Sequence, residues 1–95
     1  MPVYMVSYDI PKDNPSYAEV VEYLEKGLGA KRVLESQWLV IHEGNSEAIL
    51  GGFKSKIQEG DRLIIQKVEA RDFAWNNPIL PDEDLTLLLA SELDD

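Results

Sequence analysis

Residues 3–11 read VYMVSYDIP, and this stretch decides the fold. Residues 3–9 are rich in strand-forming side chains, and Ile10 followed by Pro11 ends the run, which predicts a β-strand. Alternate side chains fall on two faces, which hold Val3, Met5 and Ser7 on one side and Tyr4, Val6 and Tyr8 on the other. Both faces are largely apolar, so we expect this strand at the centre of its sheet.

The chain downstream alternates helical and extended patterns. Apolar residues at helical spacing predict a helix over residues 16–28, which Ser16 caps with Glu19 at capping-box spacing. A second helix follows a cap at Asn45 or Ser46. The strand signals lie on either side of this helix, at residues 31–35, 37–42 and 63–68.

This order of elements, strand-helix-strand-strand-helix-strand, predicts an α+β domain of the ferredoxin-like βαββαβ kind, with an antiparallel sheet and both helices on one face. A short extended piece over residues 71–75 is a candidate fifth strand. We assign residues 1–80 to this domain and residues 81–95 to an acidic tail that contains a short helix. The tail is either a solubilising end or a leucine-faced helix that covers a groove, and we expect the domain to keep its fold without it.

With both helices on one face, the other face of the sheet has no cover. We expect Tyr4, Val6 and Tyr8, or their neighbours on the strand, to lie on that open face. An uncovered apolar face implies a partner, and the simplest partner is another copy of the chain. The sequence therefore predicts a homodimer.

Composition narrows the class of protein. The 95 residues fit one domain and include no cysteine, which excludes disulfides and thiolate metal sites. The chain has no apolar run of the roughly 18 residues that span a bilayer, and no signal-peptide pattern. We therefore expect a cytoplasmic protein with no membrane partner.

The charge is strongly acidic, with a formal net value of −9. Six of the 18 acidic residues and none of the nine basic ones lie in residues 82–95, so the rest of the chain is mildly acidic. Nucleic-acid binders usually present a basic face, because Lys and Arg displace counterions from phosphates. Nucleic acid is therefore a disfavoured partner, and Lys31 and Arg32 form one of two short basic clusters that could contact phosphates.

Asp9 is the acidic residue of most interest, because it ends an apolar central strand where the backbone is rigid. One carboxylate is a poor magnesium site, but two copies of Asp9 could share an ion at a twofold axis. The alternative is a strand-ending Asp that bonds nearby backbone N–H groups. His42 is the only histidine, and Trp38 is more typical of a core residue than of a base-stacking platform.

Four stretches resemble one known family. They are YMVSYDI at residues 4–10, LG at 28–29, LESQWLV at 34–40 and GDRLII at 60–65. Together they resemble the SinR-like branch of the Cas-two superfamily, which is named for the second core CRISPR-associated protein. The resemblance covers roughly residues 1–75, and the tail after Pro78 matches no family element.

The resemblance implies a ferredoxin-like homodimer whose fifth strand crosses to the partner's sheet. Some members are similar to metal-dependent endoribonucleases, and the family's strand-one Asp maps onto Asp9. By this resemblance Asp9 would be the catalytic residue and the ligand of Mg²⁺ or Mn²⁺. Ser7, Tyr8 and Arg32 are weaker candidates beside it, and Tyr8, Lys31 and Arg32 are candidate nucleic-acid contacts.

Three functions therefore stay open. The first is a divalent-metal-dependent ribonuclease or nucleic-acid-associated protein of the Cas-two-like kind. The second is a nonenzymatic protein-binding dimer, such as an antitoxin or scaffold, which the sparse acid-base inventory favours. The third is a small-ligand dimeric α+β barrel, which an apolar pocket between helices and sheet would favour.

Overall fold

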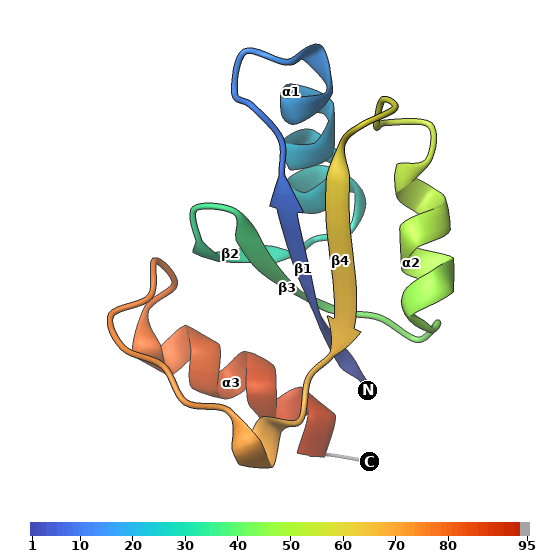
Figure 1. Ribbon diagram of the computed structural model, residues 1–95. Helices are drawn as coiled ribbons and strands as arrows, with labels where there is room; N and C mark the ends of the chain where they lie inside the picture. Colours follow the sequence, from blue (N-terminus) through green and yellow to red (C-terminus); the bar gives the residue numbers. More distant parts are fainter. Residues whose placement is uncertain (94–95) are drawn as a thin grey trace.

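The computed structural model describes residues 1–93 and shows an α+β fold with one four-stranded antiparallel sheet and three α-helices (Figure 1). The regular elements are β1 Val3–Asp9, α1 Pro15–Glu22, the π-helical turn η1 Tyr23–Gly27, β2 Lys31–Leu34, β3 Gln37–Ile41, α2 Ser46–Phe53, β4 Arg62–Lys67, the 3₁₀ turn η2 Ala70–Asp72 and α3 Asp82–Leu93.

The sheet has the order β2-β3-β1-β4, and every neighbouring pair is antiparallel. β1 pairs with β3 from Val3 opposite Ile41 to Ser7 opposite Gln37, and with β4 from Tyr4 opposite Lys67 to Asp9 opposite Arg62. The central position of β1 is the one that its two apolar faces predicted. The arrangement is compatible with a ferredoxin-like fold.

The first core lies between the sheet and the two helices α1 and α2. Tyr4, Val6 and Tyr8 of β1 pack there against Val20 of α1 and Phe53 of α2. Of the two alternatives for the side of the sheet away from these helices, Tyr4, Val6 and Tyr8 are therefore wrong, and their strand neighbours Val3 and Met5 lie there instead. The side of β1 that carries the two tyrosines is the one that the helices cover, because the aromatic rings fill the space beneath them.

The second core lies on the opposite side of the sheet, where α3 packs (Figure 1). Leu85 and Leu89 of α3 are buried against Val3, Leu39 and Val68. The expectation that the sheet and its first two helices hold every core element is therefore wrong. Of the two interpretations of the tail, the structure shows the leucine-faced helix, within residues 82–93; residues 94 and 95 of the assigned tail lie outside the described part.

Several hydrogen bonds hold α3 in this position. The terminal ammonium of Met1 donates to the Ser91 carbonyl at 2.8 Å, and the Trp75 indole N–H donates to Asp82 Oδ1 at 3.0 Å. The Ile79 backbone N–H donates to the Val33 carbonyl at 2.8 Å, which ties the preceding segment to β2. Acidic residues occupy the first turn of α3, where their negative charges interact favourably with the positive end of the helix dipole.

Two local predictions differ from the structure. Residues 70–72 form the turn η2 and residues 73–75 are irregular, so the candidate fifth strand over 71–75 is not a strand. Asn14 takes the N-cap position of α1, and Ser16 is buried inside the first turn without a hydrogen-bond partner for its hydroxyl. The predicted cap of α2 is confirmed, because Asn45 Oδ1 accepts from the Ala48 N–H at 2.8 Å.

Of the two adjacent glycines of α2, Gly52 has a packing reason, whereas a Cβ at Gly51 would meet no other atom. A Cβ at Gly52 would collide with the hydroxyl of Tyr23 in η1, whose ring meets Phe53 edge-on at 5.0 Å between centroids. The end of the first helix needs Gly29, whose φ of +63° is left-handed.

Among residues 1–93, no helix has the length and apolar character to cross a membrane.

We expect α3 to be part of the cooperative fold. Leu85→Ala should lower the free energy of unfolding by about 2–5 kcal/mol, because it empties a packed site that is 1% exposed. Leu87→Ala, on the same helix at 71% exposure, should change it by less than about 0.5 kcal/mol. Urea denaturation followed by circular dichroism gives both values. Equal, small effects of the two substitutions would contradict the packing of α3 as a core element.

Candidate functional site

Asp9 lies at the end of β1 on the α3 side of the sheet, beyond the reach of α3 itself. Its side chain is 77% exposed, and its Oδ2 lies 3.6 Å from Nη1 of Arg62, its register partner on β4. Both side chains are largely in water, so this ion pair adds at most about 1 kcal/mol of stability. The carboxylate is thus held on a rigid backbone and is free to exchange Arg62 for another cation.

The surroundings of Asp9 supply few further ligands for a metal ion. Within residues 1–93, no group of three or more His, Cys, Asp or Glu side chains could hold a metal. Magnesium takes roughly six oxygen ligands and usually keeps several waters. One chain provides one carboxylate at the end of β1. A cation could therefore be held there only if a second copy of the chain contributes its own Asp9.

The surface around Asp9 is open. It comprises Ser7, Asp9, Gln37, Arg62 and Ile64, which share one side of the sheet and which we call the open half. Ser7 lies between Gln37 of β3 and Ile64 of β4 in the register, and Ile64 is 65% exposed. The open half therefore combines hydrogen-bonding side chains with one large apolar side chain in water.

Tyr8 has a different role from its neighbour Asp9, because it points to the other side of the sheet. Its buried hydroxyl accepts from the Trp38 indole N–H at 3.1 Å and from Arg32 Nη2 at 3.4 Å, and it donates to the Glu35 carbonyl at 3.4 Å. The Arg32 guanidinium also lies over the Trp38 ring, 4.7 Å from its centroid. Tyr8 is thus the hub of a polar network that ties β1 to β2 and β3.

This network determines what Arg32 and Trp38 can do. The Tyr8 hydroxyl accepts a hydrogen bond from the guanidinium and so raises the pKa of Arg32, while burial opposes the shift. Trp38 is buried, which confirms it as a core residue. A buried tyrosine ring offers no face to a nucleic acid, and the guanidinium of Arg32 is already engaged inside the chain.

The three candidate nucleic-acid contacts, Tyr8, Lys31 and Arg32, do not form one site. Tyr8 and Arg32 meet on the side of the sheet that the first two helices cover, whereas Lys31 lines a cavity beside α3. Asp9 belongs to neither place. His42 is likewise engaged locally, because its Nδ1 accepts from the Gly44 N–H at 2.8 Å.

A surface ion pair joins the loop after β1 to the turn between β2 and β3. The ammonium of Lys12 binds the carboxylate of Glu35, and both side chains are mostly in water. This contact lowers the pKa of Glu35 and raises the pKa of Lys12, through the hydrogen bond first and the charges second. Lys12 is therefore another basic group with a partner inside the chain.

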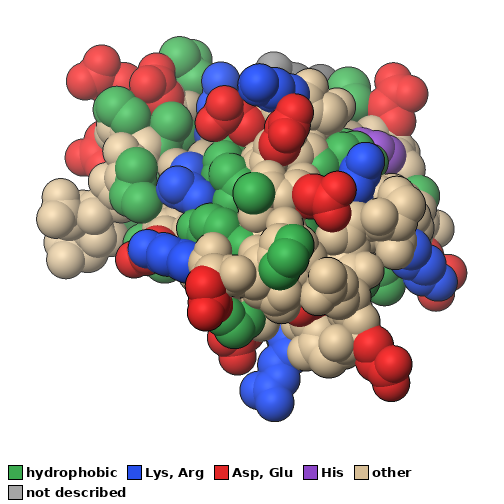
Figure 2. All heavy atoms as spheres, turned by 90° about the horizontal axis from the view of Figure 1, so that it is seen from above, with side chains coloured by type: hydrophobic (Ala, Val, Ile, Leu, Met, Phe, Trp, Pro, Cys, Tyr) green, Lys and Arg blue, Asp and Glu red, His purple; other side chains and the backbone are tan. Residues whose placement is uncertain are grey.

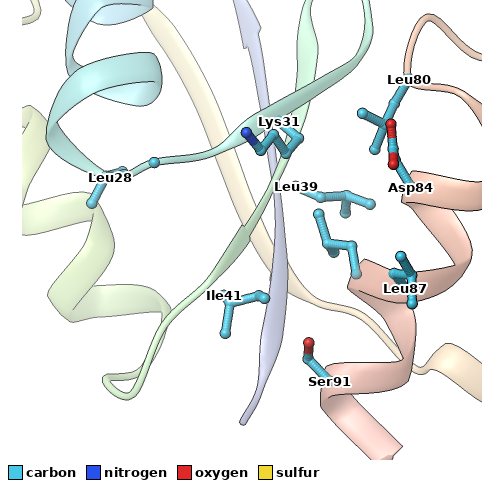
Figure 3. A pocket seen from close by; sticks show the side chains of 10 residues that line it. Leu28, Lys31, Leu39, Ile41, Leu80, Asp84, Leu87 and Ser91 are labelled. Carbon is cyan, nitrogen blue, oxygen red and sulfur yellow. The ribbon is translucent and has the colours of Figure 1, made fainter.

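A cavity of about 490 Å³ lies between α3 and the sheet (Figure 3). Most of its lining is apolar, with leucines from α3 on one wall and Leu39 and Ile41 of β3 on the other; Lys31, Asp84 and Ser91 add polar groups (Figure 3). A small-ligand protein would need an apolar pocket of this kind. It lies on a different part of the molecule from Asp9.

A second cleft, of about 370 Å³, lies under the irregular segment 73–78. Phe73, Trp75 and Leu34 form its apolar walls, and Gln37 connects it to the open half. The sequence placed residues 71–75 in a strand, which would have turned Phe73 and Trp75 to one face of the sheet. The spacing of Phe73 and Trp75 was the signal that the sequence offered. The conformation of the segment that forms the cleft depends instead on contacts with β2 and α3.

Basic side chains do not gather into one patch on the face shown in Figure 2, where they lie scattered among acidic ones. With a net charge of −9, such a surface attracts cations and repels phosphates. Comparison of the chain with known families, curated proteins and solved structures finds no match. The geometry of the described residues is therefore what bears on function.

The hub role of Tyr8 predicts a specific loss of stability. Tyr8→Phe should lower the free energy of unfolding by about 1–3 kcal/mol, because it leaves the buried Trp38 N–H without an acceptor. Tyr4→Phe is the matched control: it removes a hydroxyl that donates to the half-buried Gly44 carbonyl, which water can reach. Thermal and urea unfolding measure both, and a control loss as large as that of Tyr8→Phe would argue against the hub.

Proposed function

We propose that the protein is a ferredoxin-like, Cas-two-like homodimer in which two copies of Asp9 hold a divalent cation and cleave RNA. The observation that carries the proposal is the place of Asp9. It is an exposed carboxylate at the end of the central strand, on a part of the sheet that none of the helices within residues 1–93 covers. The resemblance of residues 1–75 to the Cas-two superfamily supports the same residue.

The open half supports pairing of two copies. α3 covers the end of the sheet that holds Val3, Leu39 and Val68, and the end that holds Ser7 and Asp9 has no such cover. Ile64 stands there in water on an edge strand, next to Ser7 in the register. A twofold axis through this end would bury both copies of Ile64 and bring the two Asp9 carboxylates together.

Asp9 and Arg62 would then have different roles in the site. Two Asp9 carboxylates anchor Mg²⁺ or Mn²⁺, and Arg62, released from Asp9, is a cation close enough to contact an RNA phosphate. The bound cation would supply Lewis-acid polarisation of the scissile phosphate and an activated water. The sheet would keep the two carboxylates in place, because each belongs to the last residue of a strand that is paired on both edges.

A second candidate is a nonenzymatic protein-binding dimer, such as an antitoxin or scaffold. One observation favours it: Lys12, Arg32 and Arg62 all have partners inside the chain. An acidic surface with engaged cations suits a basic protein partner better than a nucleic acid. The dimer is common to both candidates, and Asp9 distinguishes them.

The dimer makes the first test. Light scattering after size exclusion should give about twice the chain mass of 10.7 kDa at micromolar concentration. Ile64→Asp should shift the protein to monomer, because it places two carboxylates in the proposed interface. Leu87→Asp, an exposed leucine on α3, should leave the dimer intact. A wild-type monomer at high concentration, or equal effects of both substitutions, would exclude pairing through the open half.

Asp9 makes the second test. Asp9→Asn keeps the shape of the side chain and removes its charge, so cation-dependent cleavage of single-stranded or structured RNA should fall by orders of magnitude. Asp13→Asn, an exposed aspartate on the next loop, should cleave like the wild type. A chelator should abolish activity in every sample.

Two results would decide against the ribonuclease. Equal cleavage by the wild type and Asp9→Asn would identify a contaminating nuclease. An intact dimer with no cleavage in any sample would leave the protein-binding dimer as the function.

A further inference from the structure

The cleft under residues 73–78 has an aromatic wall, formed by Phe73 and Trp75. The rings of Phe73 and Trp75 lie 6.0 Å apart between centroids, tilted by 50°. Trp75 is 39% exposed, and Leu34 across from it is also exposed. A large aromatic surface is therefore left in water at the mouth of a preformed cavity.

Trp75 is fixed in its orientation. Its indole N–H donates to Asp82 Oδ1 at 3.0 Å, at the first residue of α3. The segment that carries it is held at its far end by the hydrogen bond from Ile79 to the Val33 carbonyl. A ring that is already ordered loses little side-chain entropy when a flat ligand stacks on it.

The remaining lining of the cleft is neutral. Gln37 and Asn76 supply carboxamide groups, and none of the described residues that line the cavity carries an ionisable side chain. In a chain of which 28% is charged, this selects against charged ligands. Aromatic walls with carboxamides fit a flat, uncharged ring whose edge carries hydrogen-bond donors and acceptors, which is the chemistry of a nucleobase.

We propose that this cleft binds an unpaired nucleobase, stacked on Trp75 and hydrogen-bonded by Gln37 and Asn76. The inference deepens the proposed function, on which it rests for its biological use: it assigns a base-binding subsite to the same side of the sheet as Asp9. Met5 lines the cleft and Asp9 follows four residues later on the same face of β1. At about 3.3 Å per residue, the backbone positions of Met5 and Asp9 lie roughly 13 Å apart along the strand.

Recognition through a base also suits the charge of the molecule. Stacking and carboxamide hydrogen bonds need no cation, so they work on a surface that repels phosphates. Trp38, the other tryptophan, is buried and offers no ring face to a base. The exposed tryptophan with a free ring surface is Trp75.

The two tryptophans make the test self-controlled. Adenosine, an uncharged probe, is titrated into the full ¹⁵N-labelled chain with EDTA present, so that neither a cation nor cleavage enters the measurement. Each tryptophan gives one indole N–H signal. The Trp75 signal and the side-chain amides of Gln37 and Asn76 should shift with one saturation curve, while the buried Trp38 signal stays in place.

Variants then assign the contact. Trp75→Leu should weaken adenosine binding about tenfold or more, as expected for loss of one stacked base. Gln37→Leu should also weaken adenosine binding. It should leave the binding of phenol, a control probe with a single aromatic ring, unchanged. Ile79→Ala, an exposed apolar residue just beyond the cleft, should bind adenosine like the wild type.

Two results would overturn the inference. The first is no shift of the Trp75 signal at millimolar adenosine in a folded protein. The second is phenol binding as tight as adenosine, which would show a general apolar cleft. Because the assay contains no cation, adenosine binding by a protein that fails to cleave RNA would uphold the base subsite while the ribonuclease is rejected.

Discussion

Burial of both faces of β1 is the constraint on which the rest of the structure depends. Val3 and Val6 point to opposite sides of the sheet, and both are fully buried. The backbone of β1 is hydrogen-bonded to β3 on one edge and to β4 on the other. A strand that is apolar on both sides cannot leave either side in water, so the chain must build two covers. The helices α1 and α2 form one cover, and α3 forms the other.

The two covers are unequal, and this difference places the candidate sites. α3 has two fully packed leucines and reaches one end of the sheet, where it buries Val3, Leu39 and Val68. The other end of the same side keeps Ser7 and Asp9 uncovered, and the irregular segment 73–78 leaves a cleft between the two regions. The carboxylate, the exposed Ile64 and the aromatic cleft therefore share one side of the sheet because a short helix cannot cover all of it. Tyr8, one residue from Asp9, belongs instead to the opposite core, where strand alternation turns it inward.

Local patterns in the sequence predicted the features that depend on neighbours in the chain. The two apolar faces of residues 3–9 indicated a central strand and Asn45 indicated a cap, both of which the structure contains. The features that were missed depend on contacts between distant residues. A leucine-faced helix in the tail was expected, but its role as part of the core was not, because the burial of Leu85 depends on residues of the distant strands β1 and β3. The Tyr8 network joins residues about 24 to 30 positions apart, so no spacing in the sequence reveals it.

The acidic charge then limits which chemistry the open side can perform. At physiological salt, repulsion between surface charges and phosphates acts over roughly 8 Å, so the acidic first turn of α3 opposes an RNA backbone that lies against it. A divalent cation shared by two Asp9 side chains would neutralise the negative charge of both carboxylates at that point only. A base held by Trp75 and carboxamides would add affinity without any basic residue. Under the proposed function, the protein would contact RNA through one cation and one base while its remaining surface repels the phosphate backbone, and short single-stranded targets would then bind better than duplexes.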